Sequence, residues 1–209
     1  IRRQRQMCIR DRTYEELYAA FMRQIHYFVD MKVRVSNYID RMFAKYAPAT
    51  FLSLFIDDCI AKGKDYYNCG PRYNTTYIQC TGLGTITDSL SSLRKHVFED
   101  KTFTMEALLD AMADNFEGHE PMRQMILNRT PFFGNDDPYA DQIAVRVFDD
   151  LYDAIEGKPN TKGECFHLNM LSTTCHVYFG KVMGATPNGR LAGRAISDLS
   201  LIHISEPTR

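Results

Sequence analysis

Residues 67–85 read YNCGPRYNTTYIQCTGLGT, and this stretch decides the fold class. Polar residues lie between apolar ones in this stretch, and we expect a short strand around Tyr77 and Ile78. Gly82 and Gly84 follow, just before a segment with helical character. A strand that passes through glycines into a helix indicates the α/β class.

Cys69 and Cys80 raise the question of whether this stretch is a catalytic loop or scaffold. A nucleophilic thiol needs a base or cation close by, and the stretch offers neither thiol a clear one. Gly82-x-Gly84 could cradle a phosphate, but the third glycine and the Lys-Ser/Thr of known phosphate loops are missing. We therefore interpret the stretch as scaffold, with a tight turn between strand and helix.

Helices dominate the rest of the chain. Thr13 and Glu16 have capping-box spacing and begin a helix expected over residues 13–44. Residues 50–65 could be a strand or a buried helix, and Gly63 favours a helix end. Further helices are expected over residues 87–99 (with Thr87 or Asp88 near the start), 104–116 (Thr104 as N-cap), 120–129 and 135–157 (Gly157 as the stop), with a strand over 164–182.

Composition places the chain among globular proteins. It has 209 residues, of which 44% are hydrophobic and 24% charged. There is no apolar run of the ~18 residues that a membrane span needs, and no secretory signal. Six cysteines without tight pairing indicate reduced, intracellular thiols rather than a disulfide framework.

The two ends differ from the middle. Residues 1–12, IRRQRQMCIRDR, and residues 199–209, LSLIHISEPTR, resemble translated sequencing adapters. Setting them aside leaves residues 13–198 as the native segment, with 19 basic and 24 acidic residues and a net charge of −5. A nucleic-acid-binding basic arm then has no support. The alternative is a small binding module whose basic arm is genuine.

Cysteine and histidine are the candidate metal ligands. Four of them fall within twelve residues: Cys165, His167, Cys175 and His176. On a strand Cys175 and His176 would point to opposite faces, so we expect no metal site.

Paired carboxylates occur twice, at Asp57–Asp58 and Asp136–Asp137. Neighbours on a helix do not face each other, and a helix N-terminus explains the second pair better. From chemistry alone, the sequence supports an α/β domain without an assigned function.

Four segments, taken in order, resemble the C-terminal half of glycyl radical enzymes, the family that includes pyruvate formate-lyase. They are FLSLFIDDCIAKGKDY (51–66), GPRYNTTYIQCTGLGTITDSLSSLRKHVFE (70–99), NFEGHEPMRQMILNRTPFFGNDDPYAD (115–141) and GKVMGATPNGRLAG (180–193). The resemblance implies a helix-rich part of a ten-stranded α/β barrel around a buried radical site. Within the family, GPRYNTTYIQ and LNMLSTTCHVYFG look most like members that dehydrate trans-4-hydroxy-L-proline.

The resemblance also implies the chemistry. A glycyl radical, installed by a separate radical S-adenosylmethionine activating enzyme, generates a thiyl radical that abstracts hydrogen from a small-molecule substrate. Water then leaves, giving a pyrroline carboxylate. The full-length parent is expected to be a hydro-lyase and a homodimer in the cytoplasm of an anaerobe. No bound cofactor, nucleic acid or membrane is expected.

The two radical motifs of the family are missing from this sequence. Neither the Gly-Cys-Val-Glu motif of the thiyl cysteine nor the Arg-Val-x-Gly-Tyr-type glycyl loop occurs. By chain order they are expected upstream of Thr13 and downstream of Asp198. We therefore expect an internal fragment that contains no catalytic residue and is inactive alone.

One substrate contact is implied by resemblance. LNMLSTTCHV (168–177) matches the strand whose threonine pair borders the substrate, which makes Thr173 a contact to the substrate carboxylate and Thr174 its neighbour. The alternative is a threonine pair packed within a barrel strand. His176 is expected to be structural rather than a proton relay. Another eliminase of the family, for a diol, choline or a sulfonate, remains open.

Overall fold

The computed structural model describes residues 13–171 and 173–197, which fall into two compact units. Unit 1 comprises Cys80–Asp149 with the flanking segments that end at Phe21 and begin at Met170. Unit 2 comprises Met22–Gln79 and Asp150–Asn169. Both ends of the chain assigned to adapter sequence lie outside the described residues, so that assignment stays a prediction.

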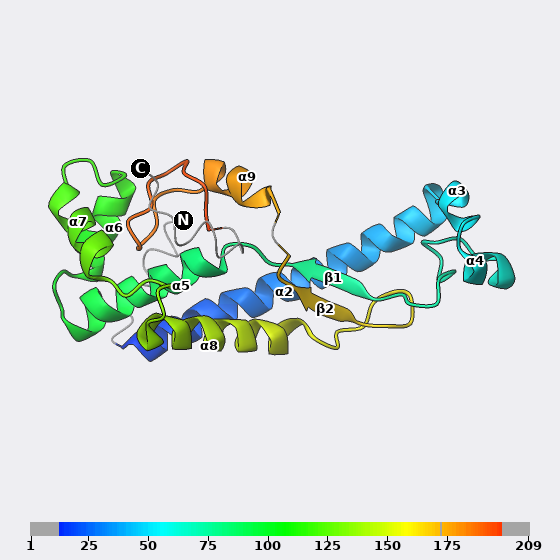
Figure 1. Ribbon diagram of the computed structural model, residues 1–209, viewed down its shortest axis with the longest axis horizontal. Coiled ribbons are helices and arrows are strands. Elements are labelled where there is room, and N and C mark those ends of the chain that lie inside the picture. The colour runs from blue at the N-terminus through cyan, green and yellow to red at the C-terminus, as the bar shows by residue number, and fades with distance from the viewer. Residues whose placement is uncertain (1–12, 172, 198–209) are drawn as a thin grey trace. The chain divides into compact units, whose positions relative to one another are not determined.

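Helices make up most of both units (Figure 1). In chain order the elements are α2 (Tyr14–Tyr46), α3 (Thr50–Ser53), α4 (Asp57–Lys62), β1 (Thr76–Gln79), α5 (Leu83–Ser92), the π-helical segment η1 (Leu93–Glu99), α6 (Met105–Ala113), α7 (Glu120–Arg129), α8 (Pro138–Ile155), β2 (Phe166–Asn169) and α9 (Cys175–Val182).

Most of the expected helices form, and two of them have the expected side-chain caps. The Glu16 amide donates to Thr13 Oγ1 at 3.2 Å, and α2 ends two residues later than expected. The Ala107 amide donates to Thr104 Oγ1, also at 3.2 Å. At the other end of a helix, Gly63 adopts a left-handed conformation (φ 60°) after α4. Residues 50–65 are therefore helical, but mostly exposed rather than buried.

The opening stretch folds as strand, tight turn and helix, as expected. β1 is followed by Gly82, whose φ of 90° starts α5 at once. The helix was expected to begin near Thr87 or Asp88, and this was wrong by about one turn. Thr87 is fully buried inside α5, because the glycine turn, rather than a side-chain cap, starts the helix.

The strand expected over residues 164–182 is only partly correct. Strand β2 stops at Asn169, and Cys175–Val182 forms helix α9. The β-branched and aromatic residues of Cys175–Val182 have a preference for strands, but tertiary context overrides such a preference. A Cβ atom on Gly180 would lie 2.2 Å from the Arg194 carbonyl oxygen, so helix and backbone meet only because this residue is glycine.

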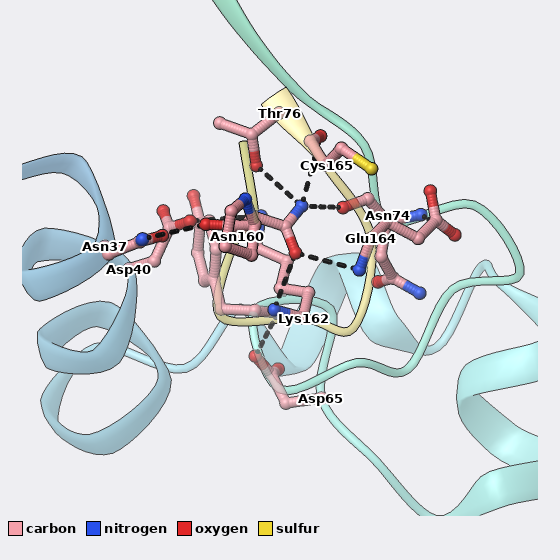
Figure 2. A network of polar contacts seen from close by, with 11 residues as sticks. Asn37, Asp40, Asp65, Asn74, Thr76, Asn160, Lys162, Glu164 and Cys165 are labelled. Carbon is pink, nitrogen blue, oxygen red and sulfur yellow. Dashed lines mark hydrogen bonds and ion pairs between the residues drawn. The ribbon is translucent and has the colours of Figure 1, made fainter. Parts of the chain in front are cut away.

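The sheet of unit 2 consists of β1 and β2, which run parallel with Thr76 opposite Phe166. Asn160 joins the loop before β2 to β1 (Figure 2). Its side-chain amide donates to the Asn74 carbonyl at 2.7 Å and to Thr76 Oγ1 at 3.1 Å, and its oxygen accepts from the amide of Glu164 at 3.0 Å. One side chain therefore sets where the two strands begin to pair.

The apolar core lies in unit 1. Residues far apart in the sequence supply it: Leu17, Leu93, Leu108, Ala111, Phe116, Ile126 and Ala185. His96 of η1 is 1% exposed, stacks on Phe103 and contacts Thr130 Oγ1 at 3.0 Å. Its pKa is lowered because burial disfavours the charged ring.

In unit 2, α2 carries a stripe of exposed apolar side chains, Phe28, Met31, Val35, Tyr38 and Met42, which we call the α2 stripe. The spacing of three and four residues places them on one helix face, and each is at least 40% exposed. A face of this kind is typical of a helix that packs against further protein.

We expect Asn160→Ala to loosen the start of the sheet. The change removes donors and an acceptor from several backbone groups, which costs about 1–3 kcal/mol. Amide hydrogen exchange in β1 and β2 should therefore accelerate by about 5- to 150-fold. Asn128→Ala, at an exposed position of α7, is the control. Equal exchange in both variants would contradict the role of Asn160.

The α2 stripe should make the 209-residue chain self-associate. Val35→Lys places a charge in the middle of the stripe and should lower the average mass measured by light scattering across a concentration series. Asn128→Lys adds the same charge elsewhere and should leave the mass unchanged. A monodisperse monomer in all three proteins would refute the expectation.

Candidate functional site

In unit 1, residues 194–197 form a segment outside the helices and strands, here called the strap, that binds the starts of two helices. The Thr85 amide of α5 donates to Ser197 Oγ, and the Ser197 amide donates to Thr85 Oγ1, both at 2.7 Å. The Ile196 amide donates to the His176 carbonyl of α9 at 3.3 Å. The strap therefore fixes the N-terminal turns of α5 and α9 to the same piece of backbone.

The glycine turn before α5 packs tightly against the strap. A Cβ atom on Gly82 would lie 2.9 Å from Ile196 Cδ1, and the φ of 90° is itself unfavourable for other residues. The Thr85 amide, which a phosphate-binding turn would offer to its ligand, is already bound to Ser197. Gly82-x-Gly84 thus serves as a tight turn, in agreement with the sequence interpretation.

Thr173 and Thr174 lie at the N-terminus of α9 rather than on a strand. The Cys175 amide donates to Thr173 Oγ1 at 3.4 Å, while Thr174 is exposed and its side chain makes no capping hydrogen bond. His176 Nδ1 lies 2.7 Å from the Thr173 carbonyl oxygen. Because a carbonyl only accepts, this nitrogen carries the proton, and the histidine holds the threonine turn in place.

This arrangement suits a carboxylate. The Cys175 and Val177 amides of the first turn of α9 already donate to Thr173 Oγ1 and to the Thr174 carbonyl oxygen, so the attraction for an anion comes from the partial positive charge of the helix start. Two threonine hydroxyls at the same place add further donors without adding a fixed charge. Neither threonine is on a strand, so the alternative of a threonine pair within a barrel strand is wrong about the element. Their role as substrate contacts stays a prediction.

The other candidate centres gain no support. Across residues 13–171 and 173–197, no three metal-ligating side chains come close enough to hold a metal ion. Asp136–Asp137 belongs to a helix start, as expected, since Asp137 Oδ1 accepts the Tyr139 amide at 2.9 Å. Asp58, in the first turn of α4, forms an ion pair with Arg72 at 3.4 Å.

Asp88 is a titratable group that the sequence analysis passed over as a possible helix start. It lies within α5, half-buried, and its Oδ1 accepts the Phe133 amide at 2.9 Å. Burial raises its pKa from an ordinary value near 3.8 to about 7, although the hydrogen bond from Phe133 opposes the shift. The sequence gave no signal of this raised pKa, because Asp88 is a lone aspartate among small residues in a helix. The strap was missed as well, because its partner Thr85 lies 112 residues from Ser197 in the sequence.

A helix that crosses a membrane must be long and apolar. Among the helices of the described residues, none has both the length and the apolar character of a membrane span.

Comparison with known proteins places the chain in a family. The pyruvate formate lyase-like family model matches residues 5–180. Trans-4-hydroxy-L-proline dehydratase from Clostridioides difficile is 47% identical over 89% of this chain. An isethionate sulfite-lyase from Oleidesulfovibrio alaskensis is 35% identical over a similar share. The chain spans about 24% and 23% of the lengths of these two relatives.

Solved structures agree with the sequence matches. The crystal structure of hydroxyproline dehydratase from Clostridioides difficile, with trans-4-hydroxy-L-proline bound, superimposes with a TM-score of 0.86 at 46% identity. The match covers 90% of this chain and 24% of that one. The expected resemblance, and the expected helix-rich α/β part of the glycyl radical enzyme barrel, are therefore confirmed.

Asp88→Asn should stabilise the protein above neutral pH. Between pH 4 and 7 the folded state binds a proton at Asp88 that the unfolded state has lost, so this group lowers the free energy of unfolding as pH rises. The cost reaches at most about 4 kcal/mol above pH 7. Asparagine keeps the acceptor for Phe133 and cannot ionise. Urea unfolding should therefore show a gain at pH 8 and little change near pH 4.

The control for this experiment is Asp110→Asn, at an exposed position of α6. It should change the free energy of unfolding by less than about 0.5 kcal/mol at either pH. An Asp88→Asn gain that is the same at both pH values would show that ionisation is not the cause.

Proposed function

Because this chain belongs to the pyruvate formate lyase-like family, we propose that it is part of a glycyl radical enzyme that eliminates water from trans-4-hydroxy-L-proline. The observation that carries the proposal is the 47% identity to a hydroxyproline dehydratase, against 35% to an isethionate sulfite-lyase over a similar length. The TM-score of 0.86 to a substrate-bound dehydratase supports it further.

In this proposal the chain binds substrate and shapes the site. The Thr173 hydroxyl donates a hydrogen bond to the substrate carboxylate, and the partial positive charge at the start of α9 stabilises the same charge. His176 holds the Thr173 carbonyl, and the strap holds His176. A neutral set of donors binds the carboxylate without placing a cation near the reaction, while the closed barrel excludes water.

The radical chemistry is supplied by groups outside this sequence. The family's glycyl radical, formed by a separate radical S-adenosylmethionine activating enzyme, provides the hydrogen abstraction that starts the elimination. The Gly-Cys-Val-Glu and glycyl motifs are not among the 209 residues, so the chain alone would turn over no substrate. The complete enzyme would be a cytoplasmic homodimer.

A sulfonate lyase is the second candidate. An isethionate sulfite-lyase from Bilophila wadsworthia is 44% identical, but over only 60% of this chain. A sulfonate is also an anion, so a helix N-terminus with threonine hydroxyls could bind either group. The substrate test must therefore include isethionate.

The test is an anaerobic assay of the full-length protein with its activating enzyme. We expect pyrroline carboxylate from trans-4-hydroxy-L-proline and no sulfite from isethionate. Lack of elimination while the glycyl radical signal persists in electron paramagnetic resonance would refute the proposed substrate.

Thr173→Val should raise KM for hydroxyproline. Loss of a hydrogen bond to a charged group costs about 1.5–3 kcal/mol, or roughly 10- to 100-fold. Thr173→Ser keeps the hydroxyl and serves as the matched control, with KM close to that of the parent. Equal KM values in the two variants would remove Thr173 from the carboxylate site.

A further inference from the structure

The two faces of the sheet in unit 2 differ in chemistry. Side chains alternate along each strand, and the register pairs Tyr77 with His167, so these two share a face. On the opposite face Phe166 is 0% and Ile78 7% exposed. We call the face that carries Tyr77 and His167 the polar face. On it, Tyr77 is 58% exposed and the His167 side chain is 32% exposed. Gln79 and Asn169 form the next pair on it.

His167 is held firmly on the polar face. Its Nδ1 contacts Glu156 Oε1, and the second carboxylate oxygen of Glu156 accepts the Leu168 amide at 3.4 Å. The Tyr77 ring lies 5.6 Å from the imidazole, measured between centroids. Since the carboxylate accepts the Nδ1 proton, the ring is fixed with Nε2 on the side away from Glu156.

A closed barrel gives these faces different surroundings. Helices cover the outside of a barrel of parallel strands, and alternate side chains fill or line its interior. The buried Phe166 and Ile78 have the character of the helix-covered side, whereas aromatic and hydrogen-bonding groups suit the wall of a small-molecule chamber.

Resting on the proposed function, we propose that the polar face lines the interior of the complete barrel, and that His167, oriented by Glu156, accepts a hydrogen bond at Nε2 from a hydroxyl or amine donor of the amino-acid substrate. Glu156 is then a positioning residue, and His167 a specificity-determining one. A purely structural role is the competing explanation, in which His167 only fixes Glu156 at the edge of β2.

Two substitutions separate the substrate role from the structural role, because each preserves the hydrogen bonding of only one of the two ring nitrogens. His167→Asn retains a donor near the Nδ1 position, and so the contact with Glu156, but has nothing at Nε2. His167→Gln retains a polar group near Nε2 and loses the contact with Glu156. We expect His167→Asn, in the full-length activated enzyme, to raise KM for hydroxyproline about 10- to 100-fold with kcat within threefold.

His119→Asn, at a part-exposed histidine of unit 1, is the matched control and should leave KM unchanged. An unchanged KM in His167→Asn, together with a defect in His167→Gln, would overturn the proposal in favour of the structural role.

Chemical modification tests the placement independently of turnover. Diethylpyrocarbonate should modify His167 readily in the 209-residue chain, at least tenfold more slowly in the full-length protein, and more slowly again with hydroxyproline bound. Equal reactivity in the chain and the full-length protein would overturn the interior placement. If His167 is protected in the full-length protein but hydroxyproline is not turned over, the proposed substrate is wrong. The placement of the polar face in the barrel interior is then still supported.

Discussion

The reciprocal hydrogen bonds between Thr85 and Ser197 are the constraint on which the candidate site depends. They join residues 112 positions apart and satisfy two backbone amides and two hydroxyls at once. Because each residue donates through its backbone amide and accepts through its hydroxyl oxygen, neither end can shift without leaving a part-buried polar atom unpaired. The close approaches at Gly82 and Gly180 follow from this, since the strap can lie against both helices only where no side chain intervenes.

The exposed surfaces of unit 2 are those of a part of a larger protein. The chain spans about a quarter of the length of the relatives it matches, and its unit 2 exposes apolar side chains along α2 that a self-sufficient domain would bury. The same unit presents a sheet with one buried apolar face and one exposed polar face. Both features make physical sense if further polypeptide covers the α2 stripe and closes a barrel over the polar face.

Local signals predicted most helices correctly, because capping residues and left-handed glycines act through contacts within one turn. Thr104 and Gly63 illustrate this. The start of α5 was mispredicted because the left-handed Gly82 turn, rather than a side-chain cap, begins the helix. The whole of α9 was mispredicted because this helix packs against the strap, which the neighbouring residues of α9 do not contain. Asp88 and the Glu156–His167 pair were missed because burial and pairing are properties of the assembled chain.

By itself the sequence determined the α/β class and the family resemblance, because these depend on residue order and local chemistry, which a sequence contains in full. Thr173 and Thr174 entered as substrate contacts only through that resemblance, and this stays a prediction. The tertiary structure alone decided that the two threonines begin a helix, that Asp88 titrates near neutrality and that His167 shares a polar face with Tyr77. Each of these rests on desolvation or on contacts between distant segments, and such energies exist only once the chain has folded.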